Sequence, residues 1–162
     1  MSKRLHGLLL FLFLAGTGLL SADDWPQWRG PERDGVWRET GIVEKLPRKL
    51  TYLWRTPVGM GYAGPAVAAG RVYLMDRVLG AGEANPDNPF NKKRVSGRER
   101  VLCFDAAGGK LLWKHSYASN YAISYPYGPR TTPTVSGGKV YCLGAMGDLL
   151  CLDAGGGKVL WS

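Results

Sequence analysis

The first candidate for chemistry is a glycine-rich stretch, GMGYAG, in which Gly59, Gly61 and Gly64 match the spacing G-x-G-x-x-G. This spacing binds a dinucleotide when a strand precedes it and a helix follows it, because the helix N-terminus faces the phosphates. Here Pro65 and another short apolar run follow at once. We therefore predict that the stretch is a loop without a nucleotide.

Cysteines are the second candidate, because Cys142 and Cys151 flank the probable turn Gly-Ala-Met-Gly-Asp. A two-residue turn at Met146 and Gly147 would place them directly opposite each other on adjacent strands. They would then form a disulfide or redox pair, or remain two small buried thiols. Because disulfides between adjacent strands are often strained, we favour buried thiols. With Cys103 they match no zinc spacing, so we assign no metal site.

Carboxylates and a histidine complete the candidates. Asp105 and Asp153 could be paired acids, but both precede a glycine-rich turn in a repeated sequence. An aspartate at such a place accepts a backbone N–H and starts the turn, so we predict turn formers. A Ser-His-Asp arrangement would depend on His115 beside Ser116 alone. We assign no catalytic residue.

Two stretches of the chain are nearly identical. VLCFDAAGGKLLW begins at Val101, and LLCLDAGGGKVLW begins at Leu149, 48 residues later. A second pair, GPAVAAGRVYLM from Gly64 and TPTVSGGKVYCL from Thr132, is 68 residues apart. Such a period indicates a repeat architecture. The offsets differ by 20 residues, so we predict an inserted loop of that length within residues 76–100.

Each repeated unit contains four short apolar runs separated by glycine-rich turns. Runs of this length between turn formers are typical of buried strands. Four antiparallel strands per repeat of about 40–50 residues are typical of a β-propeller blade. A β-sandwich is the alternative, but a tryptophan at the same place in each unit favours blades. We predict an all-β fold with about two four-stranded antiparallel blades.

The sequence LDAGGGKVLW resembles the repeat of the pyrroloquinoline quinone (PQQ) dehydrogenase-like propellers. That superfamily includes quinoprotein alcohol dehydrogenases and non-enzymatic BamB-like propellers. The opening DWPQWRGPERDGV, with YAGPAV and YGPRTTPTV, is similar to exported bacterial PQQ-like repeat proteins. The resemblance covers nearly all of the chain beyond residue 22. It implies an eight-bladed ring, of which we expect this chain to be an N-terminal fragment with about two blades.

The resemblance also implies structural roles for the recurring residues. Each tryptophan of the repeat would dock between its own blade and a neighbour, because a buried indole removes a large apolar area from water. The implied structural set is Trp54, Trp113, Trp161, Asp105, Asp153, Gly109 and Gly157.

The chain divides into three segments. Residues 1–22 hold two basic residues, a short apolar run and small residues, which are typical of a secretory signal peptide. We therefore expect export to the periplasm or cell envelope, with no transmembrane segment after cleavage. Residues 23–50 are expected to pack on the ring edge and residues 51–162 to form the blades. The middle segment holds three tryptophans that we expect to pack there: Trp25, Trp28 and Trp37.

Positive charge suggests where a partner would bind. The net charge is +8, and a balance of about +6 remains after the leader, which favours solubility over nucleic-acid binding. The charge concentrates in the inserted loop, and the tyrosine-rich stretch NYAISYPYGPR links the two units. Aromatic rings beside arginine are typical of protein-binding surfaces. The predicted partner-binding residues are Lys92, Lys93, Arg94, Tyr125, Tyr127 and Arg130.

These patterns favour an exported, non-catalytic propeller that binds a protein or another ligand through its loops. The alternative is the N-terminal part of a quinoprotein dehydrogenase that uses PQQ with calcium. That alternative requires calcium ligands, a catalytic aspartate and typically an adjacent cysteine pair, none of which can be assigned in this sequence. We assign no cofactor, and the shared fold does not decide between the two functions.

Overall fold

The computed structural model describes residues 23–162, so the predicted leader lies outside the described residues. Within that range eight strands form two four-stranded antiparallel sheets, and there is no helix. Accordingly, none of these residues forms a helix that could cross a membrane. The prediction of an all-β fold with two blades is confirmed.

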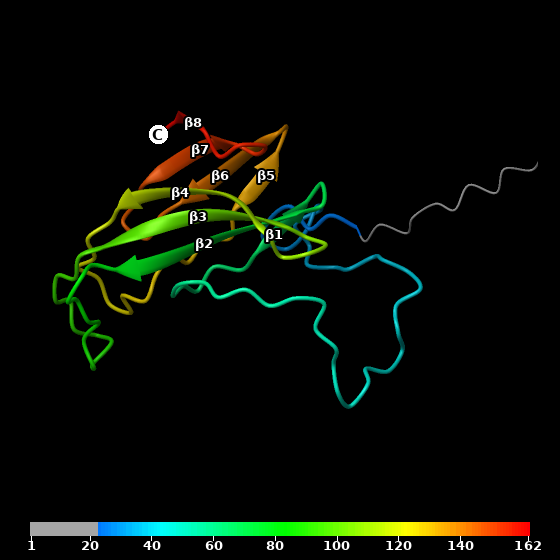
Figure 1. The fold of residues 1–162 in the computed structure, drawn as a ribbon, viewed down its shortest axis with the longest axis horizontal. Coiled ribbons are helices and arrows are strands. Elements are labelled where there is room, and N and C mark those ends of the chain that lie inside the picture. Colours follow the sequence, from blue (N-terminus) through cyan, green and yellow to red (C-terminus); the bar gives the residue numbers. More distant parts are fainter. Residues whose placement is uncertain (1–22) are drawn as a thin grey trace, which may run out of the picture.

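The first sheet has the strand order β1-β2-β3-β4, and the second has the order β5-β6-β7-β8. Figure 1 shows the sheets next to each other, the first in green and yellow and the second in orange and red. The first comprises β1 (Ala66–Ala68), β2 (Arg71–Leu79), β3 (Gly97–Asp105) and β4 (Leu111–Ala118). The second comprises β5 (Thr134–Ser136), β6 (Lys139–Leu143), β7 (Leu149–Asp153) and β8 (Val159–Trp161).

The two sheets repeat the same register. In the first sheet Cys103 pairs with Tyr73 on one side and Trp113 on the other. In the second, Cys151 pairs with Tyr141 and Trp161. A register shift follows each of these cysteines, at the same place in both units. The repeated sequence therefore produces repeated pairing.

The main core lies between the two sheets. Residues directly paired across a sheet share a face, because side chains alternate along a strand. The Tyr73, Cys103 and Trp113 row of the first sheet packs with Val140 and Leu152 of the second. The equivalent row of the second sheet lies on its opposite face. The second sheet thus packs one face on the first sheet and directs the other face away from it.

The predicted inserted loop has narrower bounds in the structure. Strands β2 and β3 pair through Leu79 and Gly97, so only residues 80–96 connect them. Pairing continues into the insertion because Asp76 and Arg77 lie opposite Arg100 and Glu99, which place opposite charges on facing strands. The prediction of a loop over 76–100 was too wide for this reason.

The N-terminal segment lies along the first strands of both sheets. Trp25 exchanges backbone hydrogen bonds with Val67 of β1, and the Pro26 carbonyl accepts one from Val135 of β5. Only Trp25 of the three tryptophans is partly buried, whereas Trp28 is 71% exposed and Trp37 is 57% exposed. Against these two sheets, the predicted packing on the ring edge is therefore seen for Trp25 and not for Trp28 or Trp37. In Figure 1 the following stretch, in cyan, runs away from the sheets.

Candidate functional site

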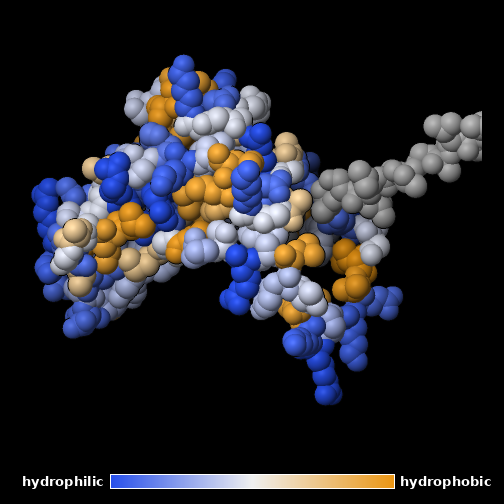
Figure 2. Space-filling model, in the orientation of Figure 1, coloured by the Kyte–Doolittle hydropathy of each residue, from blue (hydrophilic) through white to orange (hydrophobic). Residues whose placement is uncertain are grey.

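Three connecting segments meet at one end of the first sheet. They are residues 57–64, the β2–β3 connection 80–96 and the β4–β5 connection 119–133. The first segment is bonded to β2 through Met60 and Arg77, and the other two are bonded together through Val95 and Tyr121. In Figure 1 the β2–β3 connection is the green loop beyond the arrowhead of β2. Figure 2 shows hydrophilic side chains gathered at this end.

The exposed part of this end is an aromatic and basic surface that we call the loop platform, defined by Tyr62, Phe90, Tyr125, Tyr127 and Arg130. The rings of Tyr62 and Tyr127 meet edge to face with centroids 6.4 Å apart, and those of Phe90 and Tyr125 do so at 5.1 Å. A shallow hollow is lined by Tyr62, Ser124, Tyr125 and Arg130. Three of the predicted partner-binding residues are thus brought together with two that the sequence analysis did not select.

The basic residues of the prediction lie on the β2–β3 connection beside the platform. Lys92, Lys93 and Arg94 are all exposed. The adjoining residue Val95 is buried and bonded to Tyr121, so this connection is attached to the one that carries Tyr125. A direct backbone hydrogen bond from Tyr125 N to Pro89 O, 2.6 Å long, joins the same two segments.

A buried arginine lies beneath the platform. Arg77 is fully buried and donates to the carbonyl oxygens of Pro126 at 3.0 Å and Val95 at 2.9 Å. Its guanidinium also lies 3.9 Å from the centre of the Tyr121 ring. Burial lowers the pKa of this arginine. Arg77 therefore joins the β2–β3 and β4–β5 connections beneath the platform. Of its guanidinium nitrogens, only Nε lacks a hydrogen-bond partner among the described residues.

A buried glutamate joins the two sheets nearby. Glu99 is fully buried and accepts hydrogen bonds from the hydroxyls of Tyr117 and Tyr121 and from the Ala145 N–H. Burial, and then the hydrogen bond to Glu99, raise the pKa of both tyrosines. Ala145 belongs to the β6–β7 turn, so this carboxylate joins the first sheet, its outgoing loop and the second sheet.

A second buried carboxylate holds the glycine-rich loop. Asp76 is 1% exposed, pairs with Arg100 and accepts the Gly59 N–H. The hydrogen bonds that Arg100 donates to Asp76 raise the pKa of this arginine. A Cβ on Gly59 would lie 2.4 Å from the Arg77 carbonyl oxygen, so this glycine permits close backbone approach to β2. No helix follows, since β1 begins at Ala66, and the loop prediction for Gly59–Gly64 agrees with this geometry.

Sequence reasoning did not select Arg77 and Glu99. The available signal was the pair of dipeptides Asp76-Arg77 and Glu99-Arg100, whose charges are complementary when the strands are antiparallel. Both residues lie in the predicted inserted loop, and charged residues in a loop are usually exposed on the surface.

Trp54 and Trp113 each contact a turn of the sheet that follows them in the chain. Trp54 donates from Nε1 to the Ala106 carbonyl oxygen at 2.8 Å, and Trp113 donates to that of Ala154 at 3.1 Å. A Cβ on Gly109 would lie 2.5 Å from Trp54, and one on Gly157 would lie 2.4 Å from Trp113. Each indole thus lies flat against the turn of the next sheet.

The aspartates of these turns accept backbone hydrogen bonds. The Asp105 carboxylate accepts the Gly108 N–H, and that of Asp153 accepts the Gly156 N–H, each at 2.6 Å. In both turns the donor lies three residues beyond the aspartate, and both aspartates act as turn formers. Trp161 stands at the place equivalent to Trp113, packs against Tyr141 at 6.2 Å, and is 46% exposed.

The cysteine geometry differs from the prediction. Gly144 N donates to Asp148 O, which encloses a three-residue turn, so Cys142 pairs with Leu150 and Cys151 with Tyr141. One residue of register moves the two side chains to opposite faces of the sheet. All three cysteines are free and buried, so the cross-strand pairing was wrong and the buried-thiol interpretation holds.

His115 and Ser116 form no catalytic arrangement with an acid in the structure. Burial lowers the pKa of His115, with a smaller effect of Arg98, and Ser116 Oγ accepts a hydrogen bond from Arg98 at 2.9 Å. Among residues 23–162 no group of histidine, cysteine and acidic side chains is arranged to hold a metal ion.

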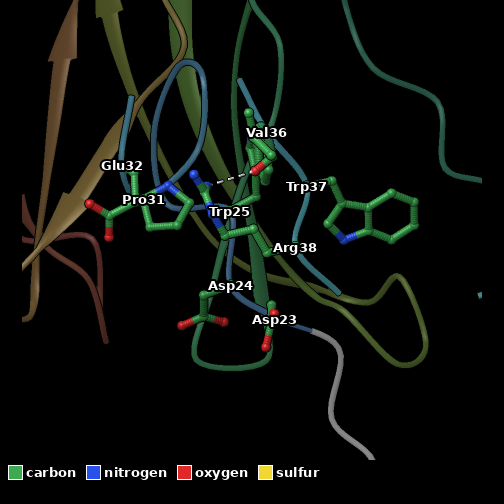
Figure 3. A pocket seen from close by; sticks show the side chains of 8 residues that line it. All are labelled: Asp23, Asp24, Trp25, Pro31, Glu32, Val36, Trp37 and Arg38. Carbon is green, nitrogen blue, oxygen red and sulfur yellow. Dashed lines mark hydrogen bonds between the residues drawn. The ribbon is translucent and has the colours of Figure 1, made fainter. Parts of the chain in front are cut away.

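A separate hollow lies in the N-terminal segment (Figure 3). Figure 3 shows Arg38 donating a hydrogen bond to the Val36 carbonyl oxygen, and the same side chain pairs with Asp34. The hydrogen bond from Arg38 holds the pKa of Asp34 at about 2. The hollow is lined by Asp23, Asp24, Trp25, Pro31, Glu32, Val36, Trp37 and Arg38. Its lining includes no member of the loop platform.

The two sheets and their tryptophan-covered turns define a class of protein, the repeat-built β-propeller. A family model described as outer membrane protein assembly factor BamB matches residues 41–162. This match covers most of the chain, and the chain therefore belongs to this family of PQQ-like repeat proteins. Among curated proteins, none matches the chain significantly.

Proposed function

We propose that this protein is an exported, non-catalytic propeller scaffold of the cell envelope that binds a protein partner through the loop platform. The observation that carries the proposal is an exposed aromatic and arginine surface whose loops are held from below by buried Arg77 and Glu99. Aromatic residues and arginine contribute most to protein–protein binding, and fixed loops lower the entropy cost of association.

Export and the envelope location rest on the leader pattern of residues 1–22 and on the family. The family is described as an assembly factor for outer membrane proteins. A periplasmic scaffold that contacts another protein agrees with both.

The quinoprotein alternative was tested against the buried carboxylates, since PQQ would need oxygen ligands for its calcium ion. Asp76 is engaged by Arg100 and the Gly59 N–H, and Glu99 by two tyrosine hydroxyls and the Ala145 N–H. Both buried carboxylates thus hold parts of the fold together, so we propose neither as a calcium ligand and assign no cofactor.

The test is affinity purification of the tagged, full-length protein from its own cells after mild cross-linking. We expect a protein partner that is recovered in stoichiometric amount with the natural sequence and lost with the double variant Tyr125→Ala/Arg130→Ala. Equal recovery with both proteins would contradict the assigned surface. Dye reduction by the full-length protein after loading with PQQ and calcium would contradict the non-catalytic role.

A further inference from the structure

The loop platform carries both exposed aromatic rings and unneutralised positive charge. Tyr62 is 49% exposed, Phe90 65% and Tyr125 43%. Surface aromatics that are scattered singly need no explanation, but these line one hollow or contact its lining. Together they offer apolar area that a bound molecule would cover.

The aromatic rings are held in place rather than lying loosely on the surface. Tyr125 has a φ of 54°, which is rare for a bulky residue and persists only when its surroundings enforce it. Its N–H is bonded to Pro89, and Arg130 Nη2 donates to the carbonyl oxygens of Ser124 at 2.6 Å and Tyr125 at 3.1 Å. Strain of this kind is concentrated at binding sites, where it fixes a side chain in its bound position.

The charge beside the rings is positive and lacks carboxylate partners. In the part of the chain that the structure describes, ion pairs join Arg38 to Asp34 and Arg100 to Asp76, and none involves Lys92, Lys93, Arg94 or Arg130. The same connections carry two carboxylates. Glu83 accepts a hydrogen bond from the Ser96 hydroxyl and also feels the charge of Lys93, although the two form no ion pair, and Asp87 is exposed.

We propose that the loop platform binds an acidic peptide segment of the protein partner, with an aromatic or aliphatic side chain in the hollow lined by Tyr62, Tyr125 and Arg130. Carboxylates of the segment would lie against Lys92, Lys93 and Arg94, and Arg130 retains guanidinium donors beyond those on Nη2. This inference rests on the proposed function and adds the chemistry of the partner. A peptide suits the surface better than a polysaccharide polyanion because the fixed hollow selects an apolar side chain.

The test measures binding of fluorescein-labelled peptides to the full-length protein by fluorescence anisotropy. One peptide is rich in glutamate and contains two phenylalanines, a second replaces every glutamate by glutamine, and a third replaces the phenylalanines by alanine. We expect the first peptide to bind, and each of the other two to bind at least about tenfold more weakly, because losing contacts that contribute about 1.4 kcal/mol or more weakens binding by that factor.

Charge reversal provides the matched comparison. Lys92→Glu/Lys93→Glu is expected to weaken binding of the first peptide about tenfold or more. Lys139→Glu/Lys158→Glu makes the same charge change at two exposed positions of the second sheet, the first residue of β6 and the β7–β8 turn, and is expected to leave binding unchanged. All four positions are exposed, so neither variant is expected to unfold.

Three outcomes would overturn the proposal. In the first, both charge-reversal variants bind the first peptide equally weakly. In the second, the phenylalanine and alanine peptides bind equally well and heparin displaces them. In the third, the first peptide does not bind. The second outcome assigns the surface to a polyanion. If the native partner is still recovered by the natural sequence and lost with Tyr125→Ala/Arg130→Ala, the proposed function stands while the acidic-peptide inference fails.

Discussion

At the scale of single residues, one contact recurs between the blades. An indole lies on a glycine of positive φ and donates to a carbonyl oxygen of the same turn, once for Trp54 and once for Trp113. The glycine is required twice over, because a side chain there would be strained and would also meet the ring. The Asp-to-Gly turn motif is therefore the receiving surface for the preceding blade.

The two reasons for glycine can be separated by a pair of substitutions. Gly157 and Gly138 have nearly the same φ, 73° and 71°, but only Gly157 has a neighbouring ring, and nothing lies within 4 Å of a Cβ on Gly138. We expect Gly138→Ala to lower the free energy of unfolding by about 1 kcal/mol, from backbone strain alone. Gly157→Ala should cost about 3 kcal/mol, because overpacking against Trp113 adds to that strain. Urea denaturation measures both, and equal costs would show that the indole contact contributes nothing.

At the scale of elements, the three-residue β6–β7 turn decides which face each cysteine occupies. It directs Cys142 into the core between the sheets and Cys151 to the opposite face. Burial raises the pKa of Cys142 from its ordinary value of 9.0 to about 12. Folding therefore favours the protonated thiol.

This pKa difference predicts an alkaline loss of stability. Below pH 9 both the folded and unfolded chains keep the proton on Cys142, and its contribution is fully present. As the pH rises from about 9 toward 12, the unfolded chain releases the proton first, so the free energy of unfolding falls. Cys142→Val removes the titrating group, and its stability should fall less steeply over this range.

Urea denaturation at a series of pH values measures the effect. Tyr117 and Tyr121, whose pKa values are raised by burial, act in the same direction in both proteins. The difference between the two curves therefore isolates the thiol. Parallel curves would mean that Cys142 is not protected from solvent.

At the scale of the whole molecule, the two faces of the blade pair are unequal. Trp113 is covered by the second sheet, whereas Trp161 and Leu149 remain about half exposed on the outer face of that sheet. In a complete propeller another blade covers such a face. The stability contribution of each docking tryptophan should therefore depend on the blade that follows it.

Alanine substitutions in the 162-residue chain test this dependence. We expect Trp113→Ala to cost about 3 kcal/mol of unfolding free energy, because it empties a packed interface. Trp161→Ala should cost less than about 1 kcal/mol, since its ring is 46% exposed. A longer chain with a further blade should raise the cost of Trp161→Ala toward that of Trp113→Ala. Equal costs in the 162-residue chain would contradict the inequality of the faces.

The sequence alone determined the all-β class, the four strands of each unit and the docking turns. Those features depend on local chemistry that is written twice, namely short apolar runs, Asp-initiated turns and glycines at positive φ. It also selected Tyr125, Tyr127 and Arg130, because aromatic residues and arginine in a connecting loop indicate binding without knowledge of the fold.

Only the tertiary structure decided the cysteine faces, the extent of β2 and β3, and the buried roles of Arg77 and Glu99. One additional residue in the β6–β7 turn moves every side chain of the following strand to the opposite face of the sheet. The amino-acid composition does not reveal the length of the turn. Arg77 and Glu99 look like surface charges in sequence, yet they are buried, because the backbone carbonyls and tyrosine hydroxyls that satisfy them come from segments distant in the chain. Such partners meet only when the two sheets and three loops are assembled.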